Sequence, residues 1–237
     1  MTLERVYRNG AAGIMNSVNA VIFDMDGVLI DSEICYMRRL GQFVQESFQK
    51  RIPEEELLRI VGASGQVHWQ TAAPYLPETW TFEDFRCAYR AYQEKKPIDY
   101  RAILFPGVLD ALAAIRQLDL RMSIATSSPR HKVEQVLEEC ELRAYFDFYI
   151  TGEDVKFSKP NPEIYLKSAA MHHVSTAKCL VVEDSNIGIR AAVEAGMCVI
   201  AKKESRYPVD QSHAHFQFQS YVELPELIGS ITKAGVR

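Results

Sequence analysis

The sequence predicts an α/β fold in which a doubly wound parallel sheet is interrupted by an inserted all-α domain. Residues 20–23 form a continuous apolar run of the β type. Only helical signals follow for roughly seventy residues, and from residue 105 onward strand-like and helical segments alternate. Repeated β–α units imply a parallel sheet with right-handed crossovers. The helical stretch therefore interrupts a sheet that begins before it.

The first predicted strand, Ala-Val-Ile-Phe at residues 20–23, is apolar at every position. Strands of this kind are buried on both faces and belong to parallel sheets covered by helices. Asp24 and Asp26 follow it directly, and Gly27 lets the chain turn after them. Because ligands of open α/β sheets bind beyond the carboxyl ends of the strands, we expect these two carboxylates to act on a small molecule.

The inserted segment has the spacing of helices throughout. Apolar side chains between Ile34 and Phe48 recur at helical intervals, and residues 54–61, 67–75 and 82–94 continue the pattern. We therefore expect an α-helical domain at residues 32–104 and a core domain formed by residues 17–31 and 105–237.

After a turn signal at Phe105-Pro106-Gly107, the second part of the core alternates regularly. Pro129 suits the first turn of one of its helices. The expected helices lie at residues 108–118, 129–139, 162–171 and 187–195, and the expected strands at residues 121–125, 146–151, 179–182 and 197–201.

Composition and charge exclude several functional classes. The 237 residues carry a formal net charge of −4, so no surplus of Lys and Arg points to nucleic acid. No apolar stretch is long enough for a membrane span, and five cysteines without Cys-x-x-Cys spacing favour a reduced, cytoplasmic protein. We expect residues 1–18 to be an N-terminal extension, with Met15 as an alternative start. The oligomeric state stays open, with a slight preference for a monomer.

Three further polar clusters belong to the core: Thr126-Ser127-Ser128, Ser158-Lys159-Pro160 and Glu183-Asp184-Ser185-Asn186. Since the carboxyl ends of parallel strands share one edge of the sheet, we expect these clusters near Asp24 and Asp26. Carboxylates suit Mg²⁺, whereas a lysine, a hydroxyl and backbone N–H groups bind phosphate oxygens. The set fits phosphoryl transfer, with Asp24 as nucleophile and Asp26 as the acid and base.

Each cluster taken alone also has a structural explanation. Ser128 is expected to cap the helix that begins near Pro129. Lys159 alone is typical of a solvated surface lysine, and Glu183-Asp184 suits a helix N-terminus. Only the joint order of the clusters favours a functional site.

In that order, Asp24-Met-Asp26-Gly27, Thr126, Lys159-Pro160 and Glu183-Asp184-Ser185 resemble the four signature motifs of the haloacid dehalogenase superfamily. The helical insertion is similar to the small α-helical cap of that superfamily, and the core to its Rossmann-like sheet. The branch it resembles contains β-phosphoglucomutase and sugar-phosphate or phosphoglycolate phosphatases. Membership in this branch implies a cap that closes over a small phosphorylated metabolite.

The resemblance also implies a role for each motif residue. It makes Asp24 the nucleophile and Asp26 the acid and base, with Gly27, Thr126, Ser127 and Lys159 binding the phosphate. It places Mg²⁺ on Asp24, Asp184 and the backbone carbonyl of Asp26. Glu183 then ligates or assists the metal, and Ser185 and Asn186 shape its surroundings.

Departures from the pattern help to choose the activity. Asp26 argues against a dehalogenase, which lacks this aspartate. Mutase-like members carry a histidine five residues after the aspartate that closes the first motif; that aspartate is Asp31 here, and Tyr36 stands in place of the histidine. They also carry an arginine in a Gly-x-Ser-Arg segment, where this chain reads Gly62-Ala63-Ser64-Gly65. We therefore expect a Mg²⁺-dependent phosphatase for a sugar phosphate or phosphoglycolate. A sugar phosphomutase and a non-catalytic phosphometabolite-binding protein are the alternatives.

Overall fold

A computed structural model describes residues 18–61 and 65–234. The expected N-terminal extension with Met15, and Gly62, Ala63 and Ser64 of the insertion, lie outside the described residues. Contacts divide the chain into two compact units, Met1–Ile30 with Tyr100–Arg237 and Asp31–Asp99. We call them the core unit and the helical unit. The domain boundaries at residues 31 and 104 stay a prediction.

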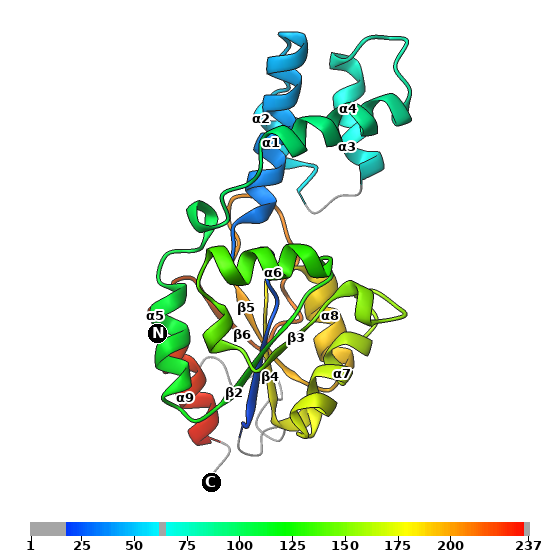
Figure 1. The fold of residues 1–237 in the computed structure, drawn as a ribbon. Helices are drawn as coiled ribbons and strands as arrows, with labels where there is room; N and C mark the ends of the chain where they lie inside the picture. The colour runs from blue at the N-terminus through cyan, green and yellow to red at the C-terminus, as the bar shows by residue number, and fades with distance from the viewer. Residues whose placement is uncertain (1–17, 62–64, 235–237) are drawn as a thin grey trace. The chain divides into compact units, whose positions relative to one another are not determined.

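The core unit contains one sheet of six strands, and every neighbouring pair is parallel (Figure 1). The predicted doubly wound parallel sheet is thereby confirmed. In spatial order the strands are β3 (Phe148–Ile150), β2 (Arg121–Ala125), β1 (Ala20–Phe23), β4 (Cys179–Glu183), β5 (Cys198–Lys202) and β6 (Phe216–Phe218).

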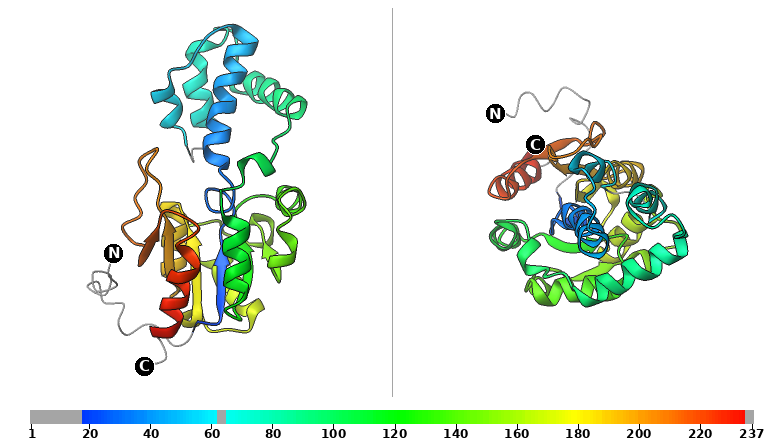
Figure 2. Two further views of the ribbon diagram at one scale, coloured as in Figure 1. Left: turned by 90° about the vertical axis from the view of Figure 1, so that its left-hand side faces the viewer. Right: turned by 90° about the horizontal axis from the view of Figure 1, so that it is seen from above.

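Four helices of the core unit pack in two pairs. Helix α5 packs against α9, and the two lie side by side from both directions of view (Figures 1 and 2). Helix α7 packs against α8, and both contribute to an apolar cluster with β1, β4 and β5. The helices are α5 (Val108–Arg116), α6 (Arg130–Glu139), α7 (Glu163–His172), α8 (Asn186–Glu194) and α9 (Leu224–Ala234), with short 3₁₀ turns at Arg101–Ile103, Arg143–Tyr145, Gly152–Asp154 and Thr176–Lys178.

The strand order reverses direction between β1 and β4, and this reversal positions the site. From β1 the chain continues to β2 on one side, whereas from β4 it continues to β5 on the other. Phe23 at the end of β1 pairs with Ile124 of β2 and Val182 of β4. The residues that follow these three strands therefore meet at the topological switch point, where open α/β sheets bind their ligands.

Two elements of the core were not predicted from the sequence, β6 and α9. The three residues of β6 pair in parallel with the end of β5. Helix α9 buries Leu224, Ile228 and Ile231. The sheet is therefore one strand wider than the sequence indicated.

The helical unit consists of helices only, as predicted, among its described residues. They are α1 (Ser32–Phe48), α2 (Glu54–Leu58), α3 (Gly65–Ala72), a 3₁₀ turn at Ala73–Tyr75, and α4 (Phe82–Lys95). Phe43 of α1 contacts Phe48 and the rings of Phe85, Tyr89 and Tyr92 on α4. Aromatic pairs of this kind therefore hold α1 against α4.

Arg39 has a structural role in the helical unit. Its guanidinium donates to the carbonyl of Gln93 at 2.6 Å and also to the carbonyl of Lys96, at the C-terminal end of α4. A cation at this end of a helix interacts favourably with the helix dipole. Arg39 is buried, so it fastens α1 to the end of α4.

Among the residues that the structure describes, no helix has both the length and the apolarity to cross a membrane. None of the five cysteines, all within the described residues, forms a disulfide, and Cys140, Cys179 and Cys198 are buried. The two buried thiols in the strands, Cys179 and Cys198, therefore pack in the core, in agreement with their apolar sequence surroundings.

Buried His172 makes stability depend on pH. Its Nε2 lies 2.8 Å from the Ser123 hydroxyl, and burial lowers the pKa of His172 although Asp147 opposes the shift. His172 therefore binds a proton more readily in the unfolded chain than in the folded one. We expect the unfolding free energy to fall as the pH drops below about 6.5, by at most about 1.4 kcal/mol per pH unit from this group.

Urea unfolding of the wild type and His172→Gln between about pH 7.5 and pH 5 measures this contribution. The variant should lose part of the pH dependence. His131→Gln, at an exposed position on α6, serves as the control and should keep it. An unchanged pH dependence in His172→Gln would contradict the prediction.

Candidate active site

Asp24, Lys159 and Glu183 form a buried charged group at the carboxyl ends of β1 and β4. Lys159 Nζ lies 2.6 Å from Asp24 Oδ1 and 2.7 Å from Glu183 Oε1, and it donates to the Ala125 carbonyl at 3.1 Å. The side chains of Lys159 and Glu183 are 3% and 1% exposed. A lysine between two buried carboxylates offsets their repulsion. Removal of any one of the three side chains would therefore leave a buried charge without its partner.

Burial and charge act against each other in this group. Burial raises the pKa of Asp24 to about 7, assisted by Glu183 and opposed by Lys159. Burial disfavours the Lys159 ammonium, but Asp24 and Glu183 outweigh it and hold the pKa of Lys159 well above its ordinary value. Lys159 therefore remains a cation beside Asp24, as a phosphate-binding lysine must.

Glu183 uses both carboxylate oxygens within the protein. Oε1 accepts from Lys159 and, at 2.9 Å, from the Tyr165 hydroxyl. Oε2 accepts from the N–H groups of Asp184 and Ser185 and from the Ser185 hydroxyl, at 2.8 to 3.0 Å. A Cβ on Gly188 would lie 1.6 Å from Oε1, so glycine makes room for this carboxylate. Of the two roles expected for Glu183, the geometry favours support of Lys159 over direct metal binding.

Asp184 lies against the turn that follows Asp24. Gly27 has a φ of +72°, and a Cβ there would lie 2.0 Å from Asp184 Oδ2. This close approach brings the Asp184 carboxylate to the backbone of the turn that carries Asp24 and Asp26. Gly27 is thus required both for its left-handed conformation and for the space it leaves.

The donor set at this position fits Mg²⁺. It comprises the carboxylates of Asp24 and Asp184 and the nearby carbonyl of Asp26, all hard oxygen donors. Within residues 18–61 and 65–234, no three His, Cys, Asp or Glu side chains are grouped as a metal site. Mg²⁺ commonly uses one or two carboxylates and completes its shell with water and substrate oxygens, so two suffice.

The segment after β2 carries the predicted phosphate-binding hydroxyl. Thr126 is buried, its N–H donates to the Ile150 carbonyl at 3.0 Å, and its hydroxyl accepts from the Ser128 N–H at 3.1 Å. Ser127 is exposed. Both residues therefore lie beyond the carboxyl end of β2, the strand next to β1, and their phosphate-binding role stays a prediction.

Ser128 was expected to cap a helix, and this expectation is wrong. Residue Pro129 occupies the N-cap position of α6, and the N–H of Arg130, the first residue of this helix, donates to Glu153 Oε1 at 3.0 Å. The Ser128 hydroxyl instead donates to Asp26 Oδ2 at 2.6 Å. Ser128 therefore lies in the candidate site beside Asp26.

Lys132 was not identified from the sequence. Its Nζ lies 2.5 Å from Asp26 Oδ1 and 3.1 Å from the Ser128 hydroxyl, and the lysine is buried. Each of the two aspartates after β1 therefore has a lysine of its own, Lys159 for Asp24 and Lys132 for Asp26.

Ser185 and Asn186 begin α8. The Ser185 hydroxyl accepts from the Gly188 N–H at 3.1 Å and so caps the helix while it also contacts Glu183. Asn186 Nδ2 donates to the Asp210 carbonyl at 2.9 Å. Gln211 Nε2 donates to the carbonyls of Asp184 and Lys202, and so links the backbone at Asp184 to the end of β5.

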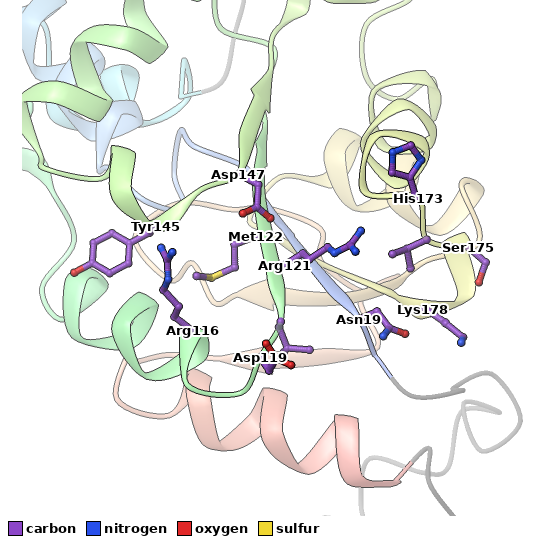
Figure 3. A pocket seen from close by; sticks show the side chains of 12 residues that line it. Asn19, Arg116, Asp119, Arg121, Met122, Tyr145, Asp147, His173, Ser175 and Lys178 are labelled. Carbon is purple, nitrogen blue, oxygen red and sulfur yellow. The ribbon is translucent and has the colours of Figure 1, made fainter.

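A hollow of about 830 Å³ lies at the amino ends of the strands, opposite the candidate site (Figure 3). Its lining includes Asn19 before β1, Arg121 at the start of β2 and Lys178 before β4. Arg116 and Arg121 donate to the carbonyls of Ala144 and His172, so both hold neighbouring backbone in place. None of the predicted site residues lines this hollow.

Comparison with known proteins agrees with the geometry. The family model described as haloacid dehalogenase-like hydrolase matches residues 21–202, which is more than half of the chain. A phosphorylated carbohydrates phosphatase of Thermotoga maritima is 36% identical over 183 residues, which cover 76% of this chain and 82% of the relative. Hexitol phosphatase B of Escherichia coli K12 is 34% identical over 188 residues, which cover 75% and 80%.

A solved structure with the same fold comes from Thermotoga maritima and is provisionally described as a beta-phosphoglucomutase. It superimposes with a TM-score of 0.76 at 28% identity, over 90% of this chain and 99% of the other. The fold described above is therefore shared by a solved protein.

Proposed function

The chain belongs to the haloacid dehalogenase-like hydrolase family, and from this premise we propose that it is a Mg²⁺-dependent phosphatase for a small phosphorylated carbohydrate. One observation carries the proposal: a buried carboxylate, Asp24, stands at the switch point of the sheet with a cation 2.6 Å away. A phosphoryl group needs such a combination, an in-line nucleophile beside positive charge.

The proposed reaction has two steps on this chain's own residues. An oxygen of Asp24 attacks phosphorus, the bond from phosphorus to the ester oxygen breaks, and Asp26 gives a proton to the leaving alcohol. Asp26 then takes a proton from a water that attacks the aspartyl-phosphate, which releases phosphate and restores Asp24. Lys159, the Thr126 hydroxyl and the backbone after β2 hold the phosphoryl oxygens.

Mg²⁺ would be held by Asp24, Asp184 and the carbonyl of Asp26. When bound, it neutralises the charge of the phosphoryl oxygens. Glu183 supports this arrangement indirectly, because it fixes Lys159 and the backbone of Asp184 and Ser185. Gly27 and Gly188 leave the space that the two carboxylates need.

The substrate class follows from the relatives. The two relatives named above are phosphatases of phosphorylated carbohydrates and of hexitol phosphates. We extend this substrate class to the present chain. Phosphoglycolate, a smaller phosphate ester, is kept as a further candidate substrate. We propose a cytoplasmic location, which is supported by five reduced cysteines, and no nucleic-acid partner for a chain of net charge −4.

A panel of sugar phosphates, hexitol phosphates and phosphoglycolate, assayed for release of inorganic phosphate with Mg²⁺, tests the proposal. We expect hydrolysis of at least one carbohydrate phosphate. Removal of the metal by EDTA should abolish it, and added Mg²⁺ should restore it, because two carboxylates of the site then lose their counter-cation. Absence of hydrolysis across the panel, or full activity in EDTA, would contradict the proposal.

The same assay separates a phosphatase from a sugar phosphomutase. The mutase alternative has one supporting observation, the solved structure described above. Incubation with β-glucose 1-phosphate and a bisphosphate primer yields inorganic phosphate from a phosphatase and glucose 6-phosphate from a mutase. We expect inorganic phosphate, because Tyr36 stands where the mutase-like pattern has histidine.

A further inference from the structure

Asp26 is held by two side chains from the segment that follows β2. Lys132 Nζ lies 2.5 Å from Asp26 Oδ1, the Ser128 hydroxyl lies 2.6 Å from Asp26 Oδ2, and these two partners are 3.1 Å apart. We propose that Lys132, together with Ser128, is the positioning residue that holds Asp26 in place for both proton transfers. This inference rests on the proposed function.

The three groups form a closed triangle, which restricts the Asp26 carboxylate more than one contact would. Each carboxylate oxygen has its own donor, so rotation about the bond to the carboxylate breaks both hydrogen bonds. The backbone beneath is fixed as well, since the Gly27 N–H donates to the Ile30 carbonyl and the Leu29 N–H to the Met25 carbonyl, both at 2.8 Å. Asp26 is thus constrained at its backbone and at its carboxylate.

The placement of Lys132 needs a functional reason, because it is unfavourable for a lysine alone. Its side chain is 10% exposed and that of Asp26 is 17% exposed. Burying a lysine costs side-chain entropy and solvation, and an ion pair with one carboxylate roughly offsets that cost. Stability therefore gives little reason for this pair, whereas an acid and base must stay within hydrogen-bond distance of its proton partner.

Local structure explains how the chain brings these residues together. The Ser128 N–H donates to the Thr126 hydroxyl, and the Lys132 N–H donates to the Pro129 carbonyl in the first turn of α6. Ser128 lies just before the N-cap of α6 and Lys132 in its first turn, and the contact of 3.1 Å between their side chains places both beside Asp26. The segment from Thr126 to Lys132 therefore supplies a proposed phosphate ligand at one end and the restraint on Asp26 at the other.

A restraint on Asp26 affects turnover and leaves substrate affinity unchanged. We expect Lys132→Met to lower kcat for p-nitrophenyl phosphate by about 10- to 100-fold and to change KM less than about threefold. Ser128→Ala removes one of the two donors and should lower kcat by about three- to tenfold. Lys167→Met is the control, because Lys167 is a half-exposed partner of Glu163 on α7, and it should retain wild-type kinetics.

A double-mutant cycle with Asp26→Asn shows whether Lys132 acts through Asp26. In the Asp26→Asn background, Lys132→Met should lower the residual kcat by less than about twofold, because the group that it positions is already gone. The folded fraction of each variant is checked by urea unfolding. If Lys132→Met does not fold, Ser128→Ala in both backgrounds gives the same test.

The outcomes are separable. Wild-type kcat in both Lys132→Met and Ser128→Ala overturns the inference, as does an equal loss of kcat with and without Asp26. A raised KM at unchanged kcat overturns it too, because Lys132 would then bind substrate. Failure of the wild type to hydrolyse any phosphate in the panel overturns the proposed function, and this inference with it.

Discussion

Asp24→Asn is expected to lower the turnover of phosphate esters by about 10⁴-fold or more, because the amide cannot act as the nucleophile. Asp24 lies at the carboxyl end of the central strand β1, and its Oδ1 accepts from Lys159. Asparagine has nearly the same shape, so the loss measures chemistry and not packing. Release of inorganic phosphate from p-nitrophenyl phosphate with Mg²⁺ gives the rate.

The fold should survive this change. Lys159 keeps its contacts with Glu183 at 2.7 Å and with the Ala125 carbonyl at 3.1 Å, so the buried ammonium is not left without partners. Asp119→Asn is the matched control, since Asp119 is exposed and its φ of 58° suits asparagine. Turnover of Asp24→Asn near the wild-type level would contradict the assignment of the nucleophile.

Lys159→Met is expected to have the largest effect on stability. The side chains of Asp24 and Glu183 are 9% and 1% exposed, and this lysine is the cation between them. Its removal leaves two buried carboxylates facing each other, which typically costs about 3–5 kcal/mol of unfolding free energy. Urea unfolding near neutral pH measures the loss, and turnover should fall as well because the phosphate loses a ligand.

The pH dependence of Lys159→Met provides an internal check. Without the lysine, the folded protein holds a proton on one of the two carboxylates more tightly than the unfolded chain does. Lowering the pH toward about 5 should therefore reduce the deficit relative to the wild type. Lys167→Met changes a half-exposed ion pair and should stay within about 0.5 kcal/mol of the wild type. A Lys159→Met protein as stable as the wild type near neutral pH would contradict this account of the charged group.

The sheet could be read from the sequence where its strands are buried on both faces. Strands β1 and β4 are apolar almost throughout, and their ends meet at the switch point as the carboxyl-end rule predicted. Strand β6 escaped notice because Phe-Gln-Phe is too short to establish a period. Helix α9 did carry a signal, since Leu224, Leu227, Ile228 and Ile231 recur at helical spacing.

The candidate site likewise contains residues that the sequence predicts and residues that it does not. Asp24, Thr126 and Asp184 each follow a strand, so topology alone brings them to one edge of the sheet. Ser128 and Lys132 stand in a helix start where a hydroxyl and a lysine have ordinary local explanations. Their contacts with Asp26 join residues that are 102 and 106 positions apart in the sequence. A local sequence pattern cannot predict a contact between residues so far apart.

The central claim is that the phosphoryl group passes through Asp24. Acid quenching of the protein during turnover of a carbohydrate phosphate with Mg²⁺, followed by mass spectrometry of its peptides, tests it directly. We expect the phosphoryl group on the peptide that contains Asp24, with none on that peptide in Asp24→Asn. A phosphoryl group on another residue during turnover, or a labelled peptide of equal yield in Asp24→Asn, would contradict it.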